Sequence, residues 1–144
     1  MLDKKIKDEI QKAYSQFLAA KSLKPRYGQK LMIAEIAKTI GNIQVNENTG
    51  TANKSHICVI EAGTGTGKTV AYLLAALPIA KALGKKLVVS TATVALQEQI
   101  TLKDLPELKK SSGLQFTHAL AKGRGRYLCL SKLDQLLVDH ESAL

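Results

Sequence analysis

Tryptophan is absent from this chain, and cysteine and proline are scarce, with two and three residues among 144. The two cysteines stand far apart and neither has a Cys-x-x-Cys partner, which favours neither a disulfide framework nor a closed zinc site. No apolar run approaches the roughly 20 residues that cross a bilayer, and acidic residues interrupt the N-terminal lysines, unlike a signal peptide. We therefore expect a cytoplasmic protein without a membrane-bound segment.

The charge of the chain is biased toward one sign. Lysine and arginine number 21 against 12 aspartates and glutamates, which gives a formal net charge of +9. Such a surface favours a polyanionic partner, because a phosphate backbone releases counterions when it is neutralised. A lysine-rich surface that is merely solvated is the alternative. The length and the 45% hydrophobic content are those of one globular domain.

A glycine-rich loop lies between an apolar segment and an apolar helix. Residues 56–60 predict a buried parallel strand, and residues 69–77 predict the helix that follows. The loop sequence AGTGTGKT matches a phosphate-binding P-loop in its alanine-first version, with an ordinary glycine-rich turn as the alternative. The residues that we predict to bind nucleotide are Ala62, Gly63, Thr64, Gly65, Thr66, Gly67, Lys68 and Thr69.

Each residue type in this loop suits a task in holding a nucleotide. The three glycines permit positive φ and close approach, so that backbone N–H groups and the helix N-terminus can face phosphate oxygens. Lys68 supplies a point charge for the β- and γ-phosphates. Thr69 offers a hydroxyl to Mg²⁺, which prefers hard oxygen ligands. We therefore predict Lys68 and Thr69 as the catalytic residues that this chain contributes.

Helices and strands alternate along the chain. Apolar residues recur at helical spacing over 2–18 and 31–40, while Pro78 is expected to kink or restart the helix after the loop and Pro106 to mark a break. Further strands are predicted at 87–91 and 115–120, further helices at 94–102 and 128–138, and a surface loop at 42–55. This order predicts an α/β fold with a parallel sheet, flanking helices and a ligand at the carboxyl ends of the strands.

A P-loop ATPase uses an acidic residue at the end of another strand to hold the Mg²⁺ water shell and to orient the attacking water. No such residue is evident in this sequence. The one similar stretch, 136–141, contains Asp139 and Glu141. Its leucines continue a helical spacing that begins at Leu130, so we favour a helix over a strand there. Because no strand that would close the sheet follows, we expect the chain to be an incomplete piece of a larger domain.

Five stretches in order resemble DinG-type DNA helicases of the XPD-like branch of superfamily 2. They are QKLMIAEIA at 29–37, EAGTGTGKT at 61–69, VVSTATVALQEQI at 88–100, KDLP at 103–106 and KGRGRYLC at 122–129. The resemblance implies a RecA-like P-loop NTPase fold, with an incomplete first motor domain over 25–144 and an amphipathic helix before it over 1–24. It also implies ATP-dependent 5′-to-3′ movement on single-stranded DNA and a role in DNA repair and replication.

The resemblance assigns a role to Gln29, with Arg26 beside it. Gln29 resembles the glutamine that recognises adenine in these helicases. An amide can pair with adenine N6 and N7 through one acceptor and one donor, and it would meet a mismatched group on guanine. An exposed helix residue without such a role is the alternative for Gln29.

A second stretch resembles the helicase motif that contacts the single strand. Its hydroxyls and backbone N–H groups, where a strand end opens a helix, suit phosphate oxygens and would position DNA without specifying its sequence. The alternative at Thr93 is a simple helix cap. The residues that we predict to contact nucleic acid are Ser90, Thr91, Thr93 and Gln97.

Cys129 ends a stretch that resembles the approach to the first of four cysteines that ligate a [4Fe–4S] cluster in this family. A cubane cluster needs four thiolates. The other cysteine, Cys58, is predicted to be buried in the strand before the loop. This chain alone therefore does not hold a cluster, which would belong to the full-length protein.

These arguments predict the N-terminal ATP-binding part of an ATP-dependent DNA helicase, with ATP, Mg²⁺ and single-stranded DNA as ligands. Two alternatives stay open. One is a P-loop kinase or other phosphotransferase, which would need a substrate-binding insertion. The other is a truncated product that binds nucleotide or nucleic acid without turnover. The sequence indicates no protein partner.

Overall fold

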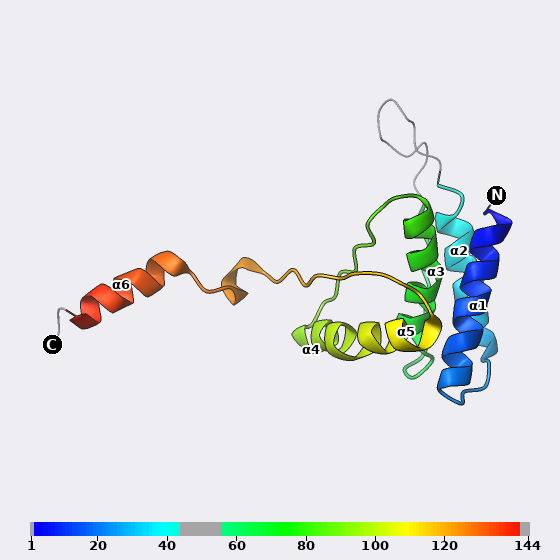
Figure 1. The fold of residues 1–144 in the computed structure, drawn as a ribbon, viewed down its shortest axis with the longest axis horizontal. Coiled ribbons are helices and arrows are strands. Elements are labelled where there is room, and N and C mark those ends of the chain that lie inside the picture. Colours follow the sequence, from blue (N-terminus) through cyan, green and yellow to red (C-terminus); the bar gives the residue numbers. More distant parts are fainter. Residues whose placement is uncertain (1, 44–55, 142–144) are drawn as a thin grey trace, which may run out of the picture.

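Helices make up all the regular structure of the residues that the computed structural model describes, which are 2–43 and 56–141 (Figure 1). The α-helices are α1 (Lys4–Ala20), α2 (Tyr27–Ile40), α3 (Lys68–Ala82), α4 (Val94–Glu98), α5 (Leu105–Ser112) and α6 (Leu130–Glu141). A π-helix, η1 (Gln99–Asp104), joins α4 to α5, and a 3₁₀ helix, η2 (Arg124–Arg126), precedes α6. Most of the predicted surface loop falls outside the described residues.

The three predicted strands are extended segments that pair with no strand in the described part of the chain. Val59 and Val88 are 90% and 86% exposed, and Cys58, predicted to be buried, is exposed as well. An apolar run becomes a strand only when a neighbouring strand accepts and donates its backbone hydrogen bonds. The predicted sheet is therefore not confirmed, and the prediction of a buried Cys58 is wrong for this structure.

The first two predicted helices are confirmed. α1 begins after Asp3, whose carboxylate accepts a hydrogen bond from the Lys5 backbone N–H at 3.0 Å, a standard N-cap. The apolar face of α1 buries Ile10, Ala13, Tyr14, Phe17 and Leu18. α2 begins two residues after Pro25 and is followed at its end by Gly41, as expected.

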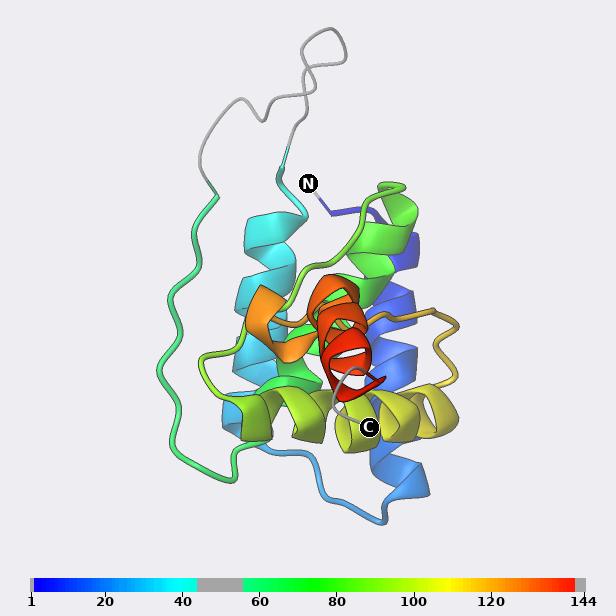
Figure 2. The same ribbon diagram turned by 90° about the vertical axis from the view of Figure 1, so that its left-hand side faces the viewer.

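α3 lies at the centre of the hydrophobic core. α2 and α1 pack against it, and α5 packs against α1 beside an ion pair between Lys21 and Glu107 (Figures 1 and 2). The helix continues through Pro78 to Ala82, so the expected restart does not occur. Pro78 is itself buried. The buried residues of α3 are Ala71, Leu73, Leu74, Ala75, Ala76, Pro78 and Ile79.

The expected break at Pro106 is a change of helix type. Proline has no backbone N–H and its ring crowds the carbonyl four residues earlier, so an α-helix cannot continue unchanged through it. The chain instead widens into η1 and resumes as α5, with Pro106 in its first turn. The Leu105 N–H accordingly donates to the Ile100 carbonyl, five residues earlier.

The segment after α5 leads away from the helical body to α6 (Figure 1). Leu130, Leu136 and Leu137 on α6 are exposed. The preference for a helix over a strand at 136–141 is confirmed, and Asp139 belongs to α6, which lies away from the helical body that contains α3 (Figure 1). Within the described residues, no helix combines the length and the apolar character needed to cross a membrane.

The core position of α3 predicts a strong contrast between two leucine substitutions. Leu74→Ala should lower the free energy of unfolding by about 2–5 kcal/mol, because Leu74 is completely buried and its truncation leaves a cavity. Leu102→Ala, at a side chain that is 77% exposed, should change it by no more than about 0.5 kcal/mol. Urea unfolding followed by circular dichroism measures both, and equal losses would contradict this description of the core.

Candidate nucleotide-binding site

The P-loop turns directly into α3. Gly65 and Gly67 have φ of 76° and 80°, in the left-handed region that favours glycine, and Gly67 is the N-cap residue of the helix. Gly63 does not have a positive φ, so the prediction of positive φ holds for two of the three glycines. Thr64 is exposed at the tip of the turn.

Side chains of the loop bond to its own carbonyls. The Lys68 ammonium donates to the carbonyl oxygens of Ala62 and Gly63 at 2.7 and 2.8 Å. The Thr66 hydroxyl donates to the same Gly63 oxygen at 2.8 Å. These bonds hold the first half of the loop in a closed turn at the N-terminus of α3.

The N-terminus of α2 holds the second half of the loop. Arg26 donates through Nη1 to the Gly65 carbonyl at 2.6 Å, and Gln29 donates through Nε2 to the Gly67 carbonyl at 3.2 Å. Gln29 is only 7% exposed, so the alternative of an exposed helix residue is wrong. The structure thus brings Arg26 and Gln29, predicted from a stretch separate from the P-loop, against that loop.

Tyr14 completes this group and was not among the predicted site residues. Its hydroxyl donates to Gln29 Oε1 at 3.0 Å, in the buried interior between α1 and α2. Sequence reasoning placed Tyr14 on the apolar face of the first helix. The available signal was the phenol itself, because a buried tyrosine hydroxyl usually finds a hydrogen-bond partner.

The arrangement suits an anion. Protein donors occupy the carbonyl oxygens of Ala62, Gly63, Gly65 and Gly67. What the turn can still offer a ligand is its backbone N–H groups together with the N-terminal dipole of α3, and both attract negative charge.

Thr69, the predicted Mg²⁺ ligand, lies half-buried in the first turn of α3 beside Tyr72. Burial raises the pKa of the Tyr72 phenol above its usual value, and the Asp104 carboxylate adds to this rise. A hydrogen bond with the Thr69 side chain acts in the opposite direction on the Tyr72 pKa without reversing the shift. Tyr72 therefore stays a neutral neighbour of the Thr69 hydroxyl at ordinary pH.

The predicted DNA-contacting residues lie where the extended segment before α4 meets the helix. Thr93 caps α4, since its hydroxyl accepts a hydrogen bond from the Leu96 N–H at 3.2 Å. The Thr91 hydroxyl donates to the Thr93 carbonyl at 3.3 Å, and Ser90 is exposed. The alternative of a helix cap at Thr93 is thus confirmed, and a cap leaves a role in DNA contact open.

Gln97 connects α4 to the segment that carries η2. Its Nε2 donates to the Ala121 carbonyl at 3.2 Å, and its Oε1 accepts from Arg126 Nη1 at 2.6 Å. The predicted DNA-contacting helix and the arginine-rich stretch before Cys129 are therefore in direct contact.

The chain does not fit an iron–sulfur cluster by itself. Cys129 and Cys58 are both exposed, and two thiols cannot provide four thiolate ligands. Among the described residues, no group of three or more histidine, cysteine or acidic side chains is placed to hold a metal ion.

Comparison with protein-family models decides the family. The model described as DEAD/DEAH box helicase matches residues 28–139, more than half of the chain. The chain belongs to the DEAD/DEAH box helicase family. Membership implies a RecA-like P-loop fold, although the sheet of that fold is not confirmed by the described residues. It also favours a helicase over the phosphotransferase alternative.

Curated relatives cover most of this chain. It is 43% identical over 136 residues, or 93% of its length, to the ATP-dependent DNA helicase DinG of Photobacterium profundum. It is 44% identical over 81% of its length to the ATP-dependent DNA helicase YoaA of Haemophilus influenzae. It is 47% identical over 78% of its length to DinG of Escherichia coli K12. The chain spans only 14–18% of the length of these three relatives.

The close approach of Gln29 to the loop predicts a difference between two glycines. Gly67→Ala should destabilise the chain by at least about 1–2 kcal/mol, because of the left-handed φ and because the added Cβ would collide with Gln29 Nε2. Gly28→Ala is the control, since a Cβ there meets nothing within 4 Å and alanine favours a helix. Urea unfolding should show a loss for the first variant and none for the second, and the reverse order would contradict the loop geometry.

Proposed function

We propose that this chain is the ATP-binding part of the first motor domain of a DinG-type, ATP-dependent 5′-to-3′ DNA helicase that acts in repair and replication. The observation that carries the proposal is the P-loop at the N-terminus of α3, held from α2 by Arg26 and Gln29. The names of the relatives, each an ATP-dependent DNA helicase, support it. We further propose a cytoplasmic location, which a DNA substrate favours.

In this proposal Lys68 and Thr69 hold the triphosphate and its Mg²⁺. The ammonium donates two of its three hydrogens to loop carbonyls, so one hydrogen remains for a phosphate oxygen. The Thr69 hydroxyl is the hard oxygen donor that Mg²⁺ prefers. When bound, the ion neutralises phosphate charge. The loop N–H groups from Gly63 to Lys68 would bind the phosphates.

The adenine end would lie near Gln29 and Arg26. Gln29 uses one amide hydrogen for Gly67 and one oxygen lone pair for Tyr14, which leaves one donor and one acceptor. That pair matches N7 and the N6 amine of adenine, whereas guanine presents two acceptors at the same edge. Selection of ATP over GTP is the expected result.

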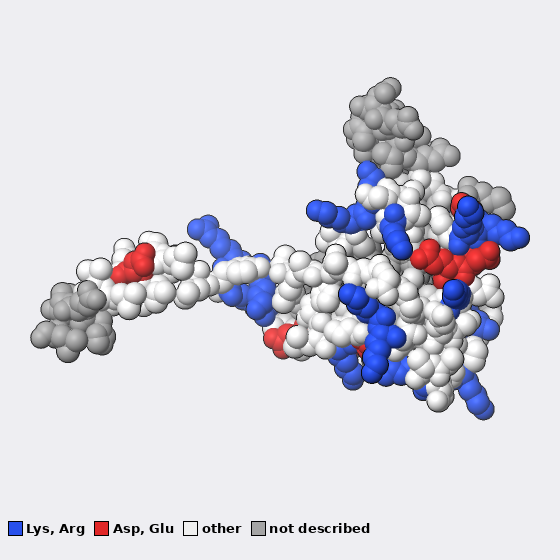
Figure 3. Space-filling view, viewed as in Figure 1, with Lys and Arg blue, Asp and Glu red and all other residues white. Residues whose placement is uncertain are grey.

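Single-stranded DNA is the proposed polyanionic partner. Ser90, Thr91, Thr93 and Gln97 lie together at the start of α4 and would contact phosphates rather than bases. On the face that Figure 3 shows, lysines and arginines are spread over the helical body and over the segment with η2, while acidic side chains form a few smaller groups, the largest on the side of the body away from α6. Such a distribution favours weak binding with little sequence preference.

We propose the division of the chain into an N-terminal helix over 1–24 and a motor-domain part over 25–144. The strands of the sheet would pair with segments that the much longer relatives contain and this chain does not. Cys129 would be the first of four cluster ligands in the full-length protein, with the other three outside this chain. The catalytic acid would likewise lie elsewhere, because Asp139 and Glu141 belong to α6.

Nucleotide binding should depend on Lys68. Lys68→Ala should lower the affinity for a fluorescent ATP analogue at least about tenfold, since the loop loses its charged phosphate donor. Lys109→Ala removes the same charge from an exposed position on α5 and should leave the affinity nearly unchanged. Equal affinities of Lys68→Ala and the unchanged chain would refute the P-loop assignment.

The chain should bind single-stranded DNA without hydrolysing ATP at a useful rate, because catalysis by positioning needs an acid and a second domain that close the site. Fluorescence anisotropy with a labelled oligonucleotide should show weak binding that falls steeply as salt rises. Single-turnover assays with and without DNA measure hydrolysis. DNA-stimulated hydrolysis that Lys68→Ala abolishes would show a complete catalytic site and would implicate Asp139 or Glu141.

A further inference from the structure

We infer that Tyr14, on α1, is a positioning residue for Gln29 and through it contributes to the choice of nucleotide base. The inference rests on the proposed function, in which Gln29 recognises adenine. It extends the proposed nucleotide site from the motor-domain part of the chain to the N-terminal helix. None of the five stretches that resemble the helicases includes a residue of that helix.

The bonds around Gln29 fix which way its amide faces. The Gly67 carbonyl can only accept a hydrogen bond, so the amide nitrogen must be on that side. The amide oxygen then faces Tyr14, whose hydroxyl must donate. The Gly67 carbonyl excludes the flipped amide, and the Tyr14 hydroxyl adds a hydrogen bond to the amide oxygen in the orientation that Gly67 selects. Together the two bonds fix the positions of the remaining acceptor lone pair and the remaining N–H of Gln29.

Discrimination between adenine and guanine requires that the free donor and the free acceptor of Gln29 keep fixed positions. Adenine presents a donor and an acceptor at its N6/N7 edge, whereas guanine presents two acceptors there. An amide that could turn freely could offer both hydrogens of its NH₂ group to guanine. Tyr14 opposes that rotation, because the rotation would leave a buried amide oxygen without its donor.

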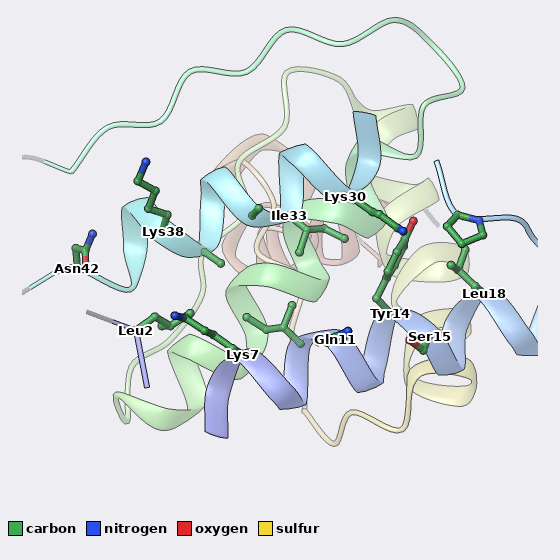
Figure 4. Close-up of a pocket in the computed structure, with 14 residues that line it drawn as sticks. Leu2, Lys7, Gln11, Tyr14, Ser15, Leu18, Lys30, Ile33, Lys38 and Asn42 are labelled. Atoms are coloured by element: carbon green, nitrogen blue, oxygen red, sulfur yellow. The ribbon is translucent and has the colours of Figure 1, made fainter. Parts of the chain in front are cut away.

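The surroundings of Tyr14 make this contact specific. The side chain is 7% exposed and extends from α1 toward α2, beside Lys30, where it borders a groove of about 770 Å³ between the two helices (Figure 4). Gln29 and Ser112 are the buried polar residues among those described, and no buried side-chain nitrogen or oxygen there lacks a partner. Removing the Tyr14 hydroxyl would therefore leave Gln29 Oε1 without its protein donor.

Four variants of the chain test the inference: Tyr14→Phe, Gln29→Ala, the double variant, and Phe17→Leu as a control for packing of α1. The ratio of affinities for fluorescent ATP and GTP analogues is measured for each. Tyr14→Phe should lower the ATP-over-GTP ratio about two- to tenfold, the range expected for one hydrogen bond. Gln29→Ala should lower it at least as far, and the double variant should equal Gln29→Ala.

The control separates positioning from stability. Phe17 is buried on the same helix but has no hydroxyl that could hydrogen-bond to Gln29. Phe17→Leu should therefore lower the unfolding midpoint and leave the ATP-over-GTP ratio unchanged. If Gln29→Ala keeps the ratio, or the unchanged chain binds neither nucleotide, the proposed base recognition fails and the inference fails with it. If Gln29→Ala lowers the ratio and Tyr14→Phe does not, or their effects add, only the role of Tyr14 is overturned.

Discussion

The burial of α3 is the constraint on which the other features of this structure depend. Alanine and leucine line the helix on several sides, so a single covering helix cannot remove its apolar surface from water. α1 and α2 pack on it, and α5 packs on α1. Since Lys68 and Thr69, the last two residues of the P-loop, are also the first two residues of α3, the packing that fixes the helix also fixes where the loop ends and which way its last N–H groups face. Any change that loosens the core would therefore loosen the proposed nucleotide site.

A second consequence follows from the position of α2. Packing of α2 along α3 places its N-terminal turn beside the loop, where Arg26 and Gln29 reach the carbonyls of Gly65 and Gly67. Tyr14 extends the same chain of contacts into α1. Among the described residues, apolar packing thus joins the three helices along their length, and the polar contacts of Tyr14, Arg26 and Gln29 connect α1 and α2 to the loop.

The sequence predicted the helices and the P-loop well, because hydrophobic periodicity and glycine spacing are local signals. Gln29 could be assigned to the site only through family resemblance, since nothing local distinguishes it from an exposed glutamine. The contact with Tyr14 depends on how α1 packs on α2, which periodicity does not specify. The prediction of strands was not confirmed for a related reason. The apolar segments around Val59 and Val88 become strands only when partner strands pair with them, and the segments themselves do not specify those partners. The exposure of Cys58 follows from the same missing pairing.

The donors that hold the P-loop explain how one site can be stable and still receive a charged ligand. The Lys68 ammonium has three hydrogens and gives two to carbonyls, and the Arg26 guanidinium has five and gives one to Gly65. Both cations therefore keep spare donors while they bond to neutral carbonyls, which offer less stabilisation than an anion does. A triphosphate would meet cations already held at the loop, so less conformational entropy remains to be lost on binding. Gln29, being neutral and buried, gains nothing from phosphate charge, so the contribution that we propose for it is confined to the base.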